Sequence, residues 1–324
     1  MSRALIEKCK EKSLRGEELS REDMISLLEI EPSSEEAKLV GAAAAEVAKK
    51  YTGGQARLWG AIGVDFKPCE MNCAFCSLGK KWGIVQEEKE YTMEEMLNQV
   101  KYYVENGFYY ILLRTTEFYS AEKLGQIIAE IKKQVPGDYI LGSNIGELDA
   151  EKAEYLYQCG AGLAYHCMRL REGVDTIFDP AERRATLEAI RDSKLDLGFW
   201  VEPVGPEHSN QELAEKILET ISYNTRVCGV MARIPVKGTP LGEYPQISDE
   251  RLAQITAVLR LACGNRAKDI CAHPAIELAV EYGANVLTLE TGAVPRNAKF
   301  TDGYWLGLDA DQAKEWLGRN GYTI

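Results

Sequence analysis

The chain has 324 residues, of which 45% are hydrophobic and 27% are charged, and this composition excludes a disordered or collagen-like protein. Its 38 Lys and Arg residues against 50 Asp and Glu residues give a formal net charge of −12, which argues against nucleic acid as a partner.

The N-terminal segment and the cysteines indicate the compartment. Residues 1–20 mix charges throughout and contain no apolar signal core, and no stretch reaches the roughly 18 apolar residues of a spanning helix. Nine cysteines form an odd number, which suits a reducing environment better than a disulfide framework. We therefore expect a cytoplasmic protein with no membrane contact.

Two helical patterns come first along the chain, over residues 2–30 and 34–51. Glu31, Pro32 and Ser33 separate them, and Gly53 and Gly54 end the second. These patterns predict an N-terminal helical extension, residues 1–54, packed against the rest of the chain.

From residue 58 onward, short β-branched or apolar runs alternate with helical patterns. Two of the intervening helices begin with capping boxes, formed by Thr92 with Glu95 and by Ser209 with Glu212. Eight repeats of a strand followed by a helix predict an α/β fold, a (βα)8 TIM-type barrel over residues 55–324. The eight candidate strands are residues 58–64, 108–113, 139–143, 162–168, 196–202, 227–234, 269–272 and 285–289.

Three cysteines follow the first strand at C-x3-C-x2-C spacing, Cys69, Cys73 and Cys76. A structural zinc site takes four ligands, and an electron-transfer 4Fe-4S cluster usually takes four cysteines. Three thiolates on one loop would instead leave one iron of a cluster open to bind another molecule. A zinc site completed by a distant His or Cys, or three thiols without function, are the alternatives.

With Phe75 just before the last cysteine, this motif resembles that of the radical S-adenosylmethionine superfamily. Most of the chain looks similar to the biotin-synthase-like group, which includes the hydrogenase-maturation radical enzyme and methylornithine synthase. The resemblance implies a 4Fe-4S cluster on Cys69, Cys73 and Cys76 that reductively cleaves S-adenosyl-L-methionine to a 5′-deoxyadenosyl radical. It also implies a small-molecule substrate and an external one-electron donor of the flavodoxin or ferredoxin type.

Several cofactor-binding residues carry over from the same resemblance. The family's Gly-Gly-Glu segment, which receives the methionyl amino group, matches Thr115, Thr116 and Glu117, with a departure at both glycines. A carboxylate such as Glu117 suits an ammonium group. Thr116 and Glu117 are therefore expected to contact the cofactor.

Three more cofactor contacts are implied further along the chain. Glu172 matches the acidic residue after the fourth strand, and Arg184, preferred over Arg183, matches the arginine that receives the methionyl carboxylate. Gly205 matches a glycine turn at the adenine. Glu172 and Arg184 could equally be solvated or paired with each other.

The reaction type has alternatives. Biotin synthase holds a second, sulfur-donating cluster on barrel cysteines and an arginine, and the corresponding places here, near Leu113, Gly142, Gly198 and Asp269, carry no such ligands. Cys167 and Cys271 could help to hold another cluster, or they could be small buried residues. Sulfur insertion of the lipoyl or biotin type and a non-catalytic iron–sulfur scaffold are thus the competing functions.

Charged residues within apolar strand runs point to a substrate site. Arg114, Glu202, Arg233 and His273 lie at or near strand ends, where barrel enzymes keep their active sites. An arginine may form a structural pair with Glu202, or Arg114 or Arg233 may receive a substrate anion. The second interpretation predicts hydrogen abstraction from a small polar, anionic metabolite in cofactor or unusual amino-acid biosynthesis, with residues 290–297 closing the cavity.

Overall fold

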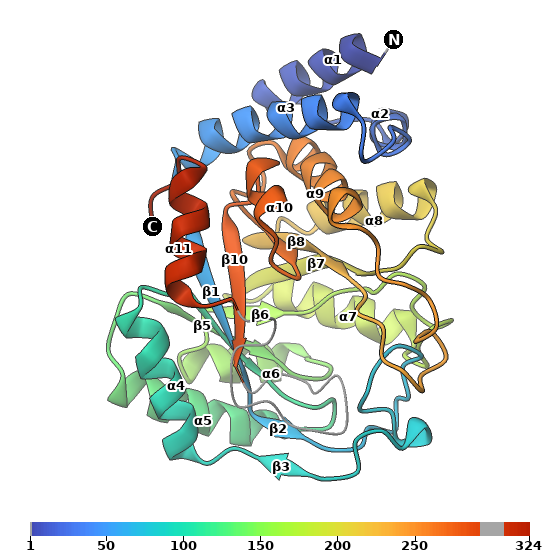
Figure 1. Ribbon diagram of the computed structural model, residues 1–324. Helices are drawn as coiled ribbons and strands as arrows, with labels where there is room; N and C mark the ends of the chain where they lie inside the picture. Colours follow the sequence, from blue (N-terminus) through green and yellow to red (C-terminus); the bar gives the residue numbers. More distant parts are fainter. Residues whose placement is uncertain (1, 292–307) are drawn as a thin grey trace.

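Eight parallel strands form a closed barrel in the computed structural model, which describes residues 2–291 and 308–324 (Figure 1). Each strand pairs with the next one along the chain, and β1 closes the barrel by pairing with both β4 and β10. All eight predicted strands are present, including the one near residue 139. The barrel strands are β1 (Arg57–Gly63), β4 (Tyr110–Arg114), β5 (Ile140–Asn144), β6 (Leu163–Tyr165), β7 (Asp196–Val204), β8 (Val227–Ala232), β9 (Asp269–His273) and β10 (Val286–Thr291).

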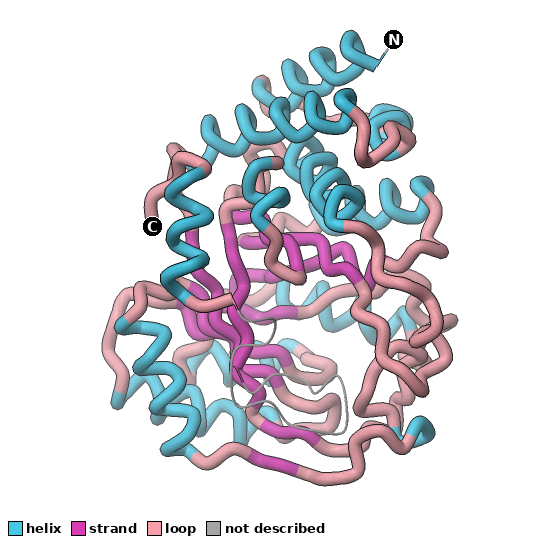
Figure 2. The backbone as a smooth tube through the Cα atoms, viewed as in Figure 1, coloured by secondary structure: helices cyan, strands magenta, loops and turns pink. Residues whose placement is uncertain are grey.

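Helices follow the strands and cover the outside of the barrel (Figure 2). Both predicted capping boxes form, at Thr92 with Glu95 and at Ser209 with Glu212, and each fixes the first turn of its helix. The helices that follow β1 are α4 (Met93–Glu105), α5 (Ala121–Gln134), α6 (Ala150–Gln158), α7 (Pro180–Arg191), α8 (Asn210–Ser222), α9 (Asp249–Cys263), α10 (Glu277–Glu281) and α11 (Ala310–Arg319). No helix among the described residues combines the length and apolar character that crossing a membrane requires.

The N-terminal segment contains three helices where the sequence predicted two. Residues 2–30 form α1 (Ser2–Leu14) and α2 (Arg21–Leu28), and α3 (Glu35–Thr52) follows. The chain breaks after α1 because Gly16 adopts a φ of +73°, and Ser20 then starts α2 by accepting a hydrogen bond from the Asp23 amide. These helices lie at the end of the molecule opposite the cysteine segment (Figure 1).

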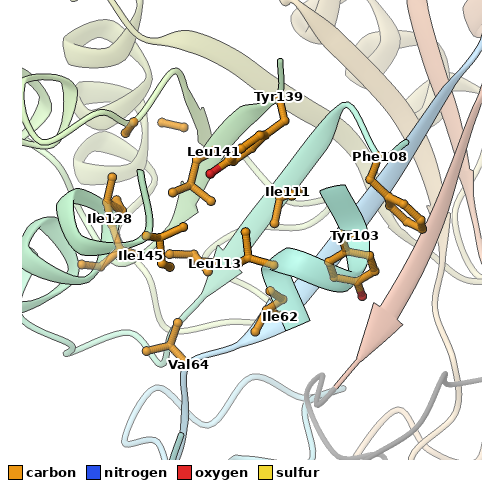
Figure 3. Close-up of a cluster of buried hydrophobic side chains, with 14 of the residues drawn as sticks. Ile62, Val64, Tyr103, Phe108, Ile111, Leu113, Ile128, Tyr139, Leu141 and Ile145 are labelled. Atoms are coloured by element: carbon orange, nitrogen blue, oxygen red, sulfur yellow. The ribbon is translucent and has the colours of Figure 1, made fainter. Parts of the chain in front are cut away.

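Alternation along the strands decides which side chains enter the barrel. Ile111 and Leu113 of β4 point outward into a cluster that includes Ile128 of α5 (Figure 3), while Leu112 belongs to the interior cluster with Trp59 and Trp200. The barrel is therefore filled at its centre by large apolar side chains, and polar side chains can gather only at its ends.

A short hairpin outside the barrel holds the cysteine segment. β2 (Asp65–Phe66) pairs in antiparallel fashion with β3 (Lys89–Glu90), and the residues between them include the 3-10 helix η1 (Lys80–Trp82). The pairing brings both ends of the segment together beside the carboxyl end of β1.

Arg260 of α9 is fully buried and connects three chain segments at the amino end of the barrel. Its guanidinium donates hydrogen bonds to the carbonyls of Gly283 and Lys268, both at 2.9 Å, and to Asn285 Oδ1 at 2.7 Å. These acceptors would lose their donor if the guanidinium were removed.

We predict that Arg260→Met lowers the free energy of unfolding by at least about 3 kcal/mol, because each unsatisfied buried acceptor costs about 1–3 kcal/mol. Urea-induced unfolding followed by circular dichroism measures this loss. Arg191→Met, on the exposed surface of α7, is the control and should change stability by less than about 0.5 kcal/mol. A loss below about 1 kcal/mol for Arg260→Met would contradict the assigned role.

Candidate active site

A cavity of about 220 Å³ opens at the carboxyl ends of the barrel strands. Its wall joins the cysteine segment to the upper layer of the barrel interior. Cys69, Cys73 and Cys76 line it, as do Arg114, Glu202 and His273 from three strands. The structure thus brings the three predicted ligands and three of the four predicted substrate residues to one cavity.

The cysteine loop, residues 69–82, is closed by its own backbone. The Cys69 amide donates to the Leu78 carbonyl at 2.7 Å, and the Trp82 indole N–H donates to the Cys73 carbonyl at 3.1 Å. Asn72 adopts a φ of +46°, a left-handed turn that asparagine tolerates better than most residues. These contacts fix the loop without using the thiols.

The same loop is tied to two later loops through Ala74, which lies between the second and third cysteines. The Ala74 amide donates to the Asp175 carbonyl at 2.8 Å, and its carbonyl accepts from the Leu241 amide at 2.9 Å. The cysteine loop therefore has a fixed position over the barrel mouth.

The spacing of the three sulfurs argues against a single zinc ion. Within residues 2–291 and 308–324, the potential ligand trio whose atoms all lie within 4.8 Å of one another is Asp175, Glu207 and His208, so at least one pair of the cysteine sulfurs is farther apart than 4.8 Å. Thiolates on one tetrahedral zinc lie about 3.8 Å apart, since each Zn–S bond is about 2.3 Å. A cluster of several irons fits this wider donor set.

Two of the three thiols, those of Cys69 and Cys73, are protonated without a metal. Burial raises the pKa of Cys73 to about 12 and also raises that of Cys69. Only thiolates bind metal strongly, so the positive charge of bound iron has to displace these protons. Phe75 is half-buried on the loop and is not among the residues that line the cavity.

Thr116 and Glu117 both line the cavity, but in different ways. The Thr116 amide donates to Asp65 at 2.7 Å and its hydroxyl also donates to Asp65, so its polar groups are already used. Burial raises the pKa of Glu117, and the charges of Arg183 and Arg169 act in the opposite direction. Glu117 is therefore a carboxylate with two nearby guanidinium groups and a face toward the cavity.

Two arginines that line the cavity share a buried carboxylate behind them. Arg169 Nη1 and Arg183 Nε lie 3.6 and 3.5 Å from the carboxylate of Glu172, and the Glu172 side chain is only 2% exposed. Burial alone would raise the pKa of Glu172, but the charge of Arg169, the Thr176 hydroxyl and the charge of Arg183 together lower it. Glu172, expected to touch the cofactor, instead lies outside the cavity lining and holds these arginines.

The structure places Arg183 in the cavity lining and Arg184 on the outer surface of α7. Arg183 is buried on the face of α7 that also carries Thr186, Leu187 and Ile190, and it lines the cavity. Arg184 is 51% exposed on the outer side and pairs with Glu219 at 3.2 Å. The i, i+3, i+4, i+7 spacing of these buried residues was present in the sequence and could have identified Arg183.

Glu147 and His166 complete the surroundings of Arg183. Glu147 accepts from Arg183 at 2.9 Å and from the Thr186 hydroxyl, and it lies 3.5 Å from His166 Nε2. Burial and the charges of Arg183 and Arg169 lower the pKa of His166 well below its ordinary value, so His166 is neutral. Arg169 and Glu147 were missed by sequence reasoning, because nothing local distinguishes them from surface charges.

Arg233 and Gly205 lie outside the cavity lining, contrary to expectation. The buried Arg233 side chain makes two hydrogen bonds to the carboxylate of Glu207, one of them at 2.8 Å. A Cβ at Gly205 would lie 2.4 Å from this pair, so Gly205 makes room for the ion pair. Arg233 therefore has a structural partner and is not available to a substrate anion.

The deeper part of the cavity contains a second paired arginine. Arg114 donates to Glu290, and His273 Nε2 lies 3.4 Å from the same carboxylate. Glu202 accepts hydrogen bonds from the Tyr165 hydroxyl and from the Cys167 thiol, the latter at 2.8 Å. The expected pair between an arginine and Glu202 does not form. Residues 292–297, expected to close the cavity, lie outside the described residues.

Comparisons with known proteins agree with this architecture. No family model matches the chain. It is 24% identical over 297 residues to a biotin synthase of Acaryochloris marina, which covers 87% of this chain and 82% of the relative. The solved structure of methylornithine synthase (PylB) has a TM-score of 0.82 at 19% identity over 97% of this chain and 96% of that one. The solved structure of HydG, a maturase of the FeFe hydrogenase, has a TM-score of 0.80 at 16% identity over 99% of this chain and 75% of that one.

We predict that Glu172→Gln lowers the free energy of unfolding by about 3 kcal/mol at neutral pH, because it removes the carboxylate partner of Arg169 and one of the two carboxylates that pair with Arg183. The pKa of Glu172 is lowered from its ordinary 4.5, so the stability it contributes is present at neutral pH and is lost as the pH falls below that value. The difference in melting temperature between the two proteins should therefore narrow toward pH 4. Glu315→Gln, in the exposed pair with Arg319, is the matched control, and an equal loss in both variants would refute the role.

Proposed function

We propose that the chain is a radical S-adenosylmethionine enzyme of the biotin-synthase-like group that acts on a small polar metabolite enclosed in the barrel. The observation that carries this proposal is one cavity lined both by three thiols at C-x3-C-x2-C spacing and by buried guanidinium groups. Hydrogen abstraction in cofactor or unusual amino-acid biosynthesis is the reaction class that we propose.

Cys69, Cys73 and Cys76 would hold the 4Fe-4S cluster. The wide spacing of their sulfurs and the rigid loop that carries them fit a donor set of this kind. When bound, the cluster supplies the electron for reductive cleavage of S-adenosyl-L-methionine, whose stable product is 5′-deoxyadenosine. The loop forms one side of the cavity and is hydrogen-bonded at Ala74 to the Asp175 and Leu241 loops.

Glu117, Arg169 and Arg183 would orient S-adenosyl-L-methionine. A carboxylate is complementary to the methionyl ammonium, and planar guanidinium groups are complementary to the methionyl carboxylate. Both arginines line the cavity, while Arg169 Nη1 and Arg183 Nε face the carboxylate of Glu172 behind it. Glu172 and Glu147 hold the two arginines in place from outside the cavity.

An external one-electron donor of the flavodoxin or ferredoxin type would reduce the enzyme. The cysteine loop is the proposed point of approach, since Lys80 and Lys81 on η1 are exposed. Trp82, one residue further, hydrogen-bonds the Cys73 carbonyl directly. Two lysines suit the negative surface that such donors present.

Sulfur insertion with a second cluster is the less favoured reaction. The barrel centre is filled by Trp59 and Trp200, whose ring centroids lie 5.3 Å apart. The interior thiols are hydrogen-bonded, Cys167 to Glu202 and Cys271 to Thr288, and burial raises the pKa of Cys271 to about 12. These two thiols already have hydrogen-bond partners within the chain, and the aromatic rings occupy the barrel centre.

We predict that replacing Cys69, Cys73 or Cys76 by Ala abolishes both the visible absorbance of the reconstituted cluster and 5′-deoxyadenosine formation, because each variant loses one of three ligands. The wild-type chain should hold about four irons, whereas sulfur insertion would need more. Cys159→Ala, a free cysteine outside the cavity lining, is the matched control and should behave as the wild type. Full cluster occupancy in Cys73→Ala would exclude the ligand assignment.

We predict that Arg183→Met weakens S-adenosyl-L-methionine binding by roughly tenfold to a hundredfold, since a charge-assisted hydrogen bond contributes about 1.5–3 kcal/mol. Arg184→Met, one residue away on the exposed face, should leave the dissociation constant within about twofold. Equilibrium binding to the anaerobically reconstituted protein measures both constants. The reverse ranking would restore the assignment of the carboxylate contact to Arg184.

A further inference from the structure

Glu202 is a buried carboxylate without a cationic partner. It lines the cavity near the end of β7 and is 7% exposed. Its two oxygens accept from the Tyr165 hydroxyl and the Cys167 thiol, both neutral donors. Among the described residues, no Lys, Arg or His nitrogen lies within 4 Å of this carboxylate.

The neutral donors stay neutral beside Glu202. Burial raises the pKa values of both Tyr165 and Cys167 well above their ordinary ranges, and the charge of Glu202 is the next largest cause in the same direction. Both groups therefore stay protonated and donate hydrogen bonds, but neither supplies a positive charge to balance the carboxylate. Buried carboxylates are costly unless they are paired with a cation.

The deeper cavity wall consequently carries a surplus of negative charge. Arg114 is matched by Glu290, and Arg233 is matched by Glu207 outside the lining. Arg169 interacts with Glu202 only at long range, and it lies closer to Glu172. The arginines that would have received a substrate anion are thus occupied, while one carboxylate faces the cavity.

Aromatic rings lie beside this carboxylate. The ring of Tyr165 lies 4.7 Å from that of Trp200, and both side chains line the same cavity as Glu202. An ammonium group gains from a carboxylate and from the faces of Trp and Tyr rings together, whereas an anion is repelled by both. The Glu202 carboxylate and these two rings on one cavity wall therefore favour a ligand group with a positive charge.

We propose that Glu202 binds an ammonium group of the substrate, so that the substrate class is amine-bearing metabolites and not purely anionic ones. The inference rests on the proposed function, because it concerns the substrate that shares the cavity with S-adenosyl-L-methionine. It replaces the anionic substrate expected from the sequence. Glu202 forms the ion pair that the folded chain leaves open, and the Tyr165 and Cys167 donors orient its oxygens.

Three small molecules with the same five-carbon chain but differently charged end groups test this inference. The probes are 1,5-diaminopentane, 1,5-pentanediol and pentanedioate, titrated calorimetrically into the anaerobically reconstituted protein with S-adenosyl-L-methionine bound. The diamine should bind at least tenfold more tightly than the diol, a difference of about 1.4 kcal/mol, and pentanedioate should bind more weakly than either. Equal binding of the three probes, or a preference for pentanedioate, would overturn the proposal.

Variants separate a binding role from a structural one. Glu202→Gln should weaken diamine binding at least tenfold and leave diol binding unchanged. Tyr165→Phe keeps the carboxylate and should retain the preference for the diamine. Glu219→Gln, a carboxylate outside the cavity lining, controls for nonspecific attraction to the acidic surface and should bind the diamine as the wild type does. Undiminished diamine binding in Glu202→Gln would refute the ammonium site.

Two readouts keep this inference separate from the proposed function. The wild-type ranking of the three probes needs no variant, so it decides the question even if Glu202→Gln fails to fold. Cluster absorbance and substrate-free formation of 5′-deoxyadenosine test the proposed function alone. If both are normal and the diamine is not preferred, only the ammonium site is wrong.

Discussion

Closure of the barrel through β1 is the constraint on which the site depends. Because β1 pairs with β4 on one side and β10 on the other, all eight strands end at one mouth. The cysteine loop leaves β1 at this mouth, and the loops after β6 and β8 hold it there through Ala74. A parallel barrel thereby brings residues that are far apart in the sequence to one site, as with Arg114 of β4 and His273 of β9, which line the same cavity.

Buried charge in this mouth follows a simple rule, in which each cation has a carboxylate of the chain within reach. Arg183 has Glu147, Arg233 has Glu207 and Arg114 has Glu290, so the desolvation of each guanidinium is offset locally. The departures from the rule are informative. Glu202 is such a departure, since its two oxygens accept only from the neutral Tyr165 hydroxyl and Cys167 thiol in the described part of the chain.

Packing explains why this polar layer is confined to the barrel mouth. Below it, Trp59, Leu112 and Trp200 fill the barrel, and a small molecule cannot pass them toward the amino end. The outward-facing residues of the same strands, such as Leu113, pack under the surrounding helices (Figure 3). The interior therefore offers one shallow chamber under the cysteine loop, which is where a reactive species can be kept from water.

The sequence by itself determined the features that depend on neighbours along the chain. Cysteine spacing, the eight alternating runs and the capping boxes at Thr92 and Ser209 all act over a few residues, so a linear pattern encodes them. Only the tertiary structure decided the charge partners, because an ion pair such as Arg114 with Glu290 joins strands 176 residues apart. Helical rotation also decided between Arg183 and Arg184, since 100° about the axis of α7 separates a cavity wall from solvent. Pairing across space has no local signature, and for this reason the surplus carboxylate at Glu202 became visible only in the folded chain.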